Sequence, residues 1–173
     1  MGIFGKISGT DERYSNYKRV ADKMFLLVRK QAKALDRNFE EIMNLSSYSF
    51  QSLRLSSFLA GAVGDAVENK DILEMRNWKF ITLNRAIEDV MTENGYKPWN
   101  LEYIFRKGAE DFSPKVLEGF AKETSFYHGG RIIAYRLRIN DEMNVKFNLT
   151  IFLDTLEAKD GYYVDGVSNK SPM

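Results

Sequence analysis

The segment RIIAYRLRINDEMNVKFNLTIFL, residues 131–153, decides the fold that the sequence predicts. On both sides of its centre apolar residues alternate with polar ones, and this period of two is typical of β-strands with one buried face. The alternating positions are Ile133, Tyr135, Leu137 and Ile139, followed by Val145, Phe147, Leu149, Ile151 and Leu153. Because the polar stretch 140–144 separates the two runs, the sequence predicts an antiparallel hairpin.

Further strands are predicted around this hairpin. Residues 155–159 and 162–165 flank Asp160-Gly161, a favoured two-residue hairpin turn, and residues 101–106 form a candidate short strand. Residues 168–173 are polar and are expected to be a flexible tail. The C-terminal part of the chain is therefore predicted to form a small antiparallel sheet.

Residues 10–94 repeat their apolar positions every three or four residues, which is typical of amphipathic helices. Three main helices are expected, over about residues 10–35, 50–69 and 71–94, with a short segment at 39–45. Asn94-Gly95 is a typical helix stop, and Gly61 and Gly64 would let another backbone pack closely on the second helix. Ser113-Pro114 predicts the start of a short helix that ends near residue 122.

Helices followed by strands predict an α+β fold, in which three main N-terminal helices pack on a small C-terminal antiparallel β-sheet. The chain has 173 residues, of which 44% are hydrophobic, and this is enough apolar material for one core. Since no linker rich in Pro, Gly or Ser divides the chain, a single domain is expected over 1–173. Its helical part covers about 10–94 and its mixed strand part about 101–167.

Charge and cysteine content exclude several classes of protein. The chain has 25 basic and 24 acidic residues, which argues against a surface built as a whole for nucleic acid or anionic lipid. It has no cysteine, so disulfides, thiolate nucleophiles and cysteine-ligated metals are excluded, and a cytoplasmic location is favoured. The first nine residues lack the continuous apolar run of a secretory signal, and no apolar run is long enough to span a membrane.

Motifs for catalysis are missing. His128 is the only histidine, so no two-histidine metal site can form within one chain. The sequence His128-Gly129-Gly130 has the glycine content of an oxyanion loop, but no Gly-x-Ser-x-Gly nucleophile motif accompanies it, and a turn before a strand is the preferred interpretation. Phosphate-binding loops are also lacking. The sequence predicts no catalytic residue, no metal and no cofactor.

Two polar surfaces are candidates for partner binding. Residues 13–37 hold eight basic and two acidic residues, and a helix would gather several of the basic ones on its outer side around an out-of-place leucine. These residues are Arg19, Leu26, Lys30, Lys33 and Arg37. The outward face of the predicted hairpin supplies Arg136, Arg138, Lys146 and Asn148. Both surfaces also fit ordinary solvated faces. Two arginines spaced by two point the same way along a strand and can grip carboxylates or phosphates with their planar forks.

We therefore expect a non-enzymatic protein-binding module, such as an inhibitor, an immunity-type protein or a chaperone-like adaptor of a bacterium or phage. The partner is expected to be another protein, with Arg136 and Arg138 as its first contacts, because arginines are common binding hot spots. The alternative is a nucleic-acid-associated factor that uses the basic helix face and the hairpin arginines. That reading is weakened because the hairpin face lacks exposed aromatics for base stacking. An enzyme with a carboxylate or tyrosine site ranks third.

Overall fold

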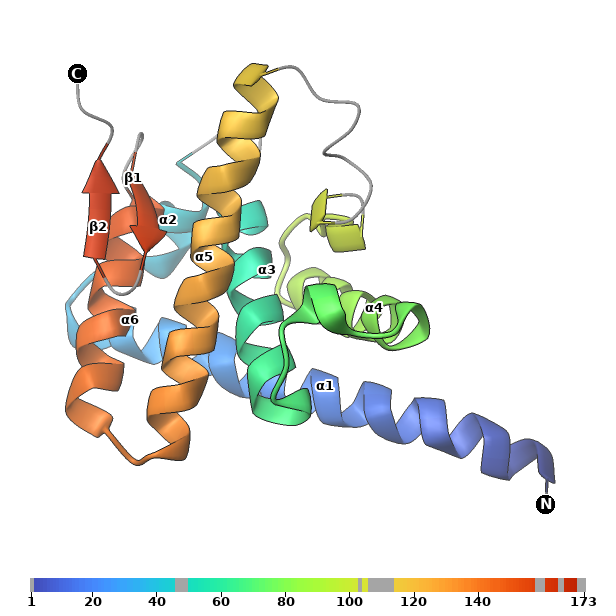
Figure 1. Ribbon diagram of the computed structural model, residues 1–173. Coiled ribbons are helices and arrows are strands. Elements are labelled where there is room, and N and C mark those ends of the chain that lie inside the picture. Colours follow the sequence, from blue (N-terminus) through green and yellow to red (C-terminus); the bar gives the residue numbers. More distant parts are fainter. Residues whose placement is uncertain are drawn as a thin grey trace.

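The chain is helical in its computed structural model (Figure 1). The structure describes the backbone of residues 2–45, 50–102, 104–105, 114–157, 161–164 and 167–170. Within these segments it describes the side chains of residues 11–45, 51–102, 104–105 and 125–157. In this part of the chain, no helix combines the length and apolar composition needed to cross a membrane.

The described elements follow one another as helices, with a two-stranded ribbon at the end. The α-helices are α1 (Gly2–Ala34), α2 (Phe39–Met43), α3 (Phe50–Val63), α4 (Asn77–Glu93), α5 (Pro114–Arg138) and α6 (Glu142–Glu157). A π-helical turn, η1 (Gly64–Glu68), continues α3, and a 3₁₀ turn, η2 (Ile72–Glu74), precedes α4. Strands β1 (Gly161–Val164) and β2 (Val167–Lys170) pair antiparallel, with Gly161 opposite Lys170 and Val164 opposite Val167.

The helical prediction for residues 10–94 is confirmed in the described segments, although the third helix, α4, begins at Asn77 rather than near residue 71. Helix α1 begins earlier than expected, at Gly2, and ends at Ala34, close to the predicted end. Helix α4 ends at Glu93, and Gly95 follows with a φ of 87°, a left-handed conformation that favours glycine at a helix end. The start of a helix at Pro114 is also confirmed, but α5 runs to Arg138 rather than stopping near residue 122.

The predicted β-hairpin over residues 131–153 is wrong, because both of its runs are helical. Helix α5 buries Phe126, Tyr127, Gly130, Ile133 and Ala134, which are spaced as one side of a helix. The alternation that suggested a strand starts at Arg131, and counting from there leaves out the buried residues that precede it. The buried residues therefore follow the helical period over residues 125–138, the part of α5 whose side chains are described.

Helix α6 shows the same conflict of periods. Val145 and Leu149 are buried as the strand prediction required, but Phe147 between them is 58% exposed. The turn predicted at residues 140–144 is confirmed only in part: residues 139–141 join two helices, and residues 142–144 already belong to α6. Asn140 has a φ of 58°, and the Asp141 carboxylate accepts a hydrogen bond from the backbone N–H of Asn144 (3.4 Å), as a residue at a helix start commonly does.

Most of the remaining strand predictions also need correction. Residues 155–157 belong to α6, and residues 101–102 and 104–105 are helical, whereas residues 162–164 do lie in strand β1. Residues 103, 106, 158–160 and 165 lie outside the described residues. Strand β2 runs into the segment that was expected to be a flexible tail. In the described segments the only pairing of strands is the short ribbon against α5 and α6, so the protein is helical and not α+β with a β-sheet.

Helix α3 forms the centre of the molecule, with α5 in front of it, α1 below, α4 on one side and α6 on the other (Figure 1). Every described side chain from Gln51 to Asp65 is buried. The backbones of α3 and α5 approach so closely that a Cβ added at Gly61 would lie 1.9 Å from the carbonyl oxygen of Tyr127. A Cβ at Gly130 would lie 1.9 Å from the carbonyl oxygen of Phe58. The close packing predicted from Gly61 is therefore confirmed.

Candidate functional site

The outer side of α5 carries a large exposed aromatic side chain and a large exposed aliphatic side chain next to an arginine. We name the α5 face by its residues, which lie three or four positions apart and so share one side of the helix: His128, Ile132, Tyr135, Arg136 and Ile139. Tyr135 is 52% exposed and Ile139 is 50% exposed. The opposite side of α5 packs on α3, whereas this side faces away from α3.

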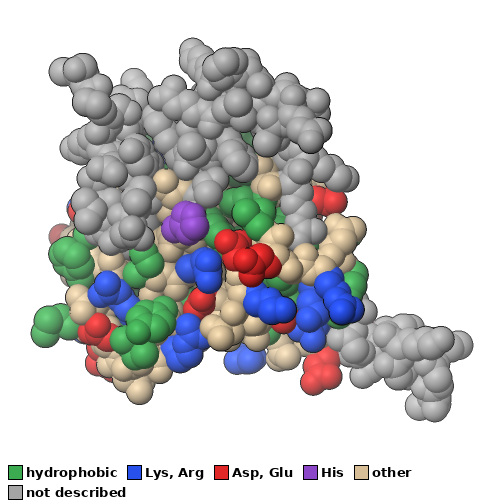
Figure 2. All heavy atoms as spheres, viewed as in Figure 1, with side chains coloured by type: hydrophobic (Ala, Val, Ile, Leu, Met, Phe, Trp, Pro, Cys, Tyr) green, Lys and Arg blue, Asp and Glu red, His purple; other side chains and the backbone are tan. Residues whose placement is uncertain are grey.

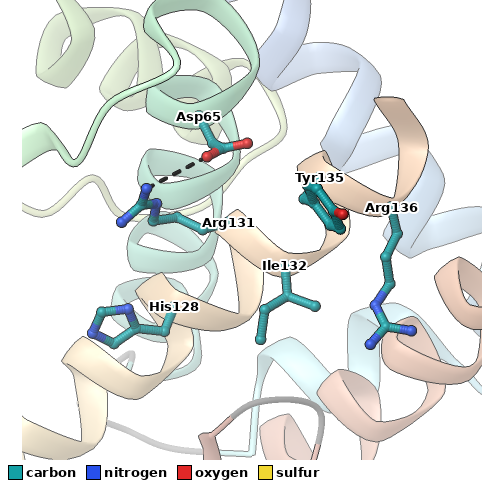
Figure 3. A pocket seen from close by; sticks show the side chains of 6 residues that line it. All are labelled: Asp65, His128, Arg131, Ile132, Tyr135 and Arg136. Carbon is teal, nitrogen blue, oxygen red and sulfur yellow. Dashed lines mark ion pairs between the residues drawn. The ribbon is translucent and has the colours of Figure 1, made fainter. Parts of the chain in front are cut away.

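A hollow of about 490 Å³ lies along the α5 face. Its lining consists of Asp65, His128, Arg131, Ile132, Tyr135 and Arg136. Figure 3 shows that Arg131 points toward Asp65, whereas Arg136 lies on the other side of Ile132 and Tyr135 and points away from that pair. The two arginines therefore lie at different ends of the hollow.

Asp65 neutralises two of the three arginines in this part of α5. Its carboxylate lies 2.7 Å from Nη2 of Arg138 and 3.5 Å from Nη2 of Arg131, and only 8% of its side chain is exposed. Arg131 also lies 3.7 Å from Asp71. Arg136, in contrast, forms no ion pair with any residue that the structure describes. Its guanidinium group is therefore free to bind a carboxylate from outside the chain.

Tyr127 braces the inner side of the same helix. Its hydroxyl donates to Oδ1 of Asp71 (2.7 Å) and accepts a hydrogen bond from the backbone N–H of Ile72 (2.9 Å). Burial, together with the hydrogen bond to Asp71, raises the pKa of Tyr127 well above its ordinary value. The hydroxyl therefore keeps its proton and holds α5 against η2, which gives Tyr127 a structural role.

The π-helical turn η1 presents a second carboxylate, that of Glu68. It accepts a hydrogen bond from Oη of Tyr17 (2.5 Å) and forms ion pairs with Arg13 and with Lys79, the latter at 3.6 Å. Burial acts to raise the pKa of Glu68, but the hydrogen bonds from Tyr17 and Arg13 outweigh it, so the pKa is lowered. π-Helical turns often occur at functional sites. Here, however, both carboxylates of the turn are engaged by the protein's own side chains.

The apolar surface continues across the turn between α5 and α6. Met143 is 81% exposed and Phe147 is 58% exposed, and their spacing of four places them on one side of α6. Figure 2 shows hydrophobic side chains gathered at the lower left, where Figure 1 places this turn, with basic side chains beside them. The α5 face and the start of α6 together expose four large apolar residues.

The predicted partner-binding residues of the hairpin are separated in the structure. Residues two apart in a helix point about 200° from each other, so Arg136 and Arg138 do not share a side as they would along a strand. Arg138 binds Asp65, and Lys146 is exposed on α6. Asn148 is 1% exposed and is therefore buried rather than presented to a partner.

The predicted residues of α1 are mostly on the surface. Arg19, Lys30 and Lys33 are exposed, and Leu26 is 49% exposed, which makes it a surface leucine as the helical period predicted. Arg37 follows the helix and forms an ion pair with Asp154 of α6. Arg19 and Arg138 came from two separately predicted surfaces, yet both line one small hollow between α1 and α5.

Half of the basic residues at 13–37 are paired with carboxylates. The paired residues are Arg13, Lys18, Arg29 and Arg37. Those that form no ion pair with the described residues are Arg19, Lys23, Lys30 and Lys33. The local excess of positive charge seen in the sequence is therefore much smaller on the folded surface.

Three residues of the candidate site were assigned to the protein core by the strand prediction. They are Tyr135, Ile139 and Phe147, and all three are more exposed than buried neighbours such as Ile133. A helical period counted from Phe126 would have placed Tyr135 and Ile139 outside, and one counted from the buried Val145 would have done the same for Phe147. Among the described residues there is no cluster of three His, Cys, Asp or Glu side chains that could hold a metal ion.

Comparison of the chain with models of protein families, with curated proteins and with solved structures gave no match.

Proposed function

We propose that this protein is a non-enzymatic protein-binding module that acts through the α5 face and the adjoining Met143 and Phe147. The observation that carries the proposal is the exposure of four large apolar side chains near Arg136, an arginine that forms no ion pair with the described residues. Tyr135, Ile139, Met143 and Phe147 are each at least half exposed, and Arg136 lines the hollow.

The composition of this surface favours a protein partner. Burying a large apolar side chain stabilises a complex by about 1.5–3 kcal/mol when the burial is complete, so four such groups are a substantial source of affinity. Tyr, Phe, Met and Arg are the residue types enriched in the centre of protein interfaces, whereas Lys and Glu are depleted there. The α5 face together with Met143 and Phe147 has this composition, whereas lysines make up three of the four unpaired basic residues in the described segment 13–37.

The partner that suits this surface carries apolar side chains and a carboxylate. The apolar groups would cover Tyr135 and Ile139, and the carboxylate would receive the planar fork of Arg136. An inhibitor, an immunity-type protein or a chaperone-like adaptor works by this kind of contact. Nucleic-acid binding is supported less well, because the ion pairs of Arg13, Lys18, Arg29 and Arg37 reduce the positive charge available for phosphates.

Affinity capture from the native host, followed by mass spectrometry and by nuclease treatment, tests the proposal. The chain is compared with a Tyr135→Ala, Ile139→Ala variant and with a Leu73→Ala, Ile81→Ala control. The control removes two apolar side chains of similar exposure, 48% and 45%, from another part of the surface. We expect a captured protein that the first variant loses and the control retains. A partner that both variants retain, or capture of nucleic acid alone, would refute the proposal.

A further inference from the structure

A second hollow, smaller than the one on the α5 face, lies where α1 passes the C-terminal half of α5. Its volume is about 230 Å³. Its floor is aliphatic and consists of Val20, Met24, Ala66, Ala134 and Leu137. Ala66 and Ala134 have short side chains, and this leaves the hollow open between the longer residues of α1 and α5. We call this hollow the α1–α5 pocket.

Positive charge surrounds the aliphatic floor. The rim is formed by Arg19, Lys23 and Arg138, and no acidic residue lines the pocket among the residues that the structure describes. Arg138 already binds Asp65 and donates to Asn69 (3.1 Å). Arg19 and Lys23 form no ion pair with the described part of the chain, so two cations at the rim lack a counter-charge.

Size and chemistry select among possible occupants. A volume of about 230 Å³ is below the range of roughly 300–1,000 Å³ that is usual for small-molecule sites, and suits one inserted side chain better. The lining has no aromatic residue on which a nucleobase could stack. A bare phosphate would leave the aliphatic floor uncovered. An acidic protein segment with one apolar side chain satisfies both the floor and the rim.

The geometry points to the α1–α5 pocket as the site that accepts an apolar anchor residue from an acidic segment of a partner protein. The anchor packs on Ala66 and Leu137, beside the buried Val20 and Met24, and carboxylates on either side of it pair with Arg19 and Lys23. The inference rests on the proposed protein-binding function, but it concerns a neighbouring pocket whose lining does not include Tyr135 or Ile139. Arg138 lines this pocket and its guanidinium lies over the Tyr135 ring, 5.8 Å from the ring centroid, so one partner can contact the pocket and the α5 face together.

Nuclear magnetic resonance titration of the full chain with short peptides tests this inference. The probe is the capped peptide Glu-Glu-Leu-Glu-Glu, compared with Glu-Glu-Ala-Glu-Glu and Lys-Lys-Leu-Lys-Lys. We expect saturable shift changes at Val20, Met24 and Leu137 with the first peptide, with a dissociation constant on the order of 1 mM. Replacing the central Leu with Ala should weaken binding at least about fivefold, and the basic peptide should not bind.

Two variants and one matched control localise the binding. Ala66→Leu fills the pocket from an exposed position without changing any charge, and it should abolish the shifts. Lys23→Glu reverses the rim charge and should weaken binding at least about fivefold. Lys30→Glu makes the same change of charge on the same helix but outside the pocket lining, and it should leave binding within about twofold. Thermal unfolding of each variant shows whether its fold is retained.

Several results would overturn the inference. One is equal binding of the Leu and Ala peptides with equal losses in Lys23→Glu and Lys30→Glu, which would mean diffuse charge attraction. A second is that sodium decanoate or an oligothymidylate shifts the same residues while the peptide does not. A third is that the same residues shift when only the protein concentration is raised. Capture of a partner that Ala66→Leu retains and that Tyr135→Ala, Ile139→Ala loses would leave the proposed function standing while rejecting the pocket.

Discussion

Replacing Gly130 by alanine should destabilise the protein, because the backbones of α3 and α5 meet at this residue. The added Cβ would lie 1.9 Å from the carbonyl oxygen of Phe58 and 2.9 Å from the backbone nitrogen of Ala62. Real Cβ atoms essentially never come within 3.0 Å of such neighbours, so about 1.1 Å of clearance is missing. Both contacts are with backbone, which cannot rotate away as a side chain can.

The magnitude follows from two opposing effects. Overpacking a well-packed core typically costs about 1–3 kcal/mol, and a clash with backbone belongs at the upper end. Alanine gains about 1 kcal/mol over glycine in helix propensity, which offsets part of this cost. The expected net loss in the free energy of unfolding is about 2 kcal/mol, which corresponds to a fall in Tm of about 4–8 °C for a chain of this size.

Urea denaturation followed by circular dichroism measures this loss. Gly64→Ala is the comparison variant, since its nearest neighbour is a side-chain methyl, Cγ2 of Ile72 at 2.6 Å, and its nearest backbone atom, the carbonyl oxygen of Lys70, lies at 3.3 Å rather than 1.9 Å. We expect this variant to cost less than Gly130→Ala, because its closest backbone contact is much longer. If Gly130→Ala were as stable as the unmodified protein, or no less stable than Gly64→Ala, the close packing of α5 on α3 would be refuted.

The remaining predictions concern charged side chains. Arg136→Ala should change the free energy of unfolding by less than about 0.5 kcal/mol but weaken partner binding by about 1–2 kcal/mol in a calorimetric titration, and unchanged affinity would move the interface elsewhere. Arg138→Ala should cost up to about 1 kcal/mol of stability, because it breaks a partly exposed ion pair with Asp65, and an unaffected Tm would refute this role. Glu68 has a lowered pKa in the folded state, so its contribution to stability is present above its unfolded pKa and is lost as the pH falls through the folded value. The Tm difference between the unmodified protein and Glu68→Gln should therefore be largest near about pH 7 and shrink toward about pH 3, and a difference that grows in acid would contradict the assignment.

The sequence alone determined those features that depend on neighbours along the chain. The helices of residues 10–94, the stop at Gly95 and the start at Pro114 follow from local periodicity, backbone conformation and capping. A turn between residues 138 and 142 was located to within a few residues for the same reason. The exposure of Leu26 also follows from the period of its own helix.

Only the tertiary structure decided whether residues 131–153 are helices or strands. Their apolar residues fit both periods over short windows, so local pattern could not separate the two. The helical conformation is favoured because Gly130 lets α5 approach α3. It is also favoured because the Phe152 ring packs on Phe126, with centroids 5.8 Å apart, and on Phe58, with centroids 4.1 Å apart. These contacts join segments that are far apart in sequence.

The candidate site divides in the same way. That Arg136 and Arg138 are cations near the end of one element was evident from the sequence, but their different roles were not. Arg138 is engaged by Asp65, which lies 73 residues earlier in the chain, and Arg136 has no such partner among the described residues. Which charges a fold neutralises, and which apolar side chains it leaves exposed, depend on the packing of distant helices, because burial and ion pairing are set by distances in space.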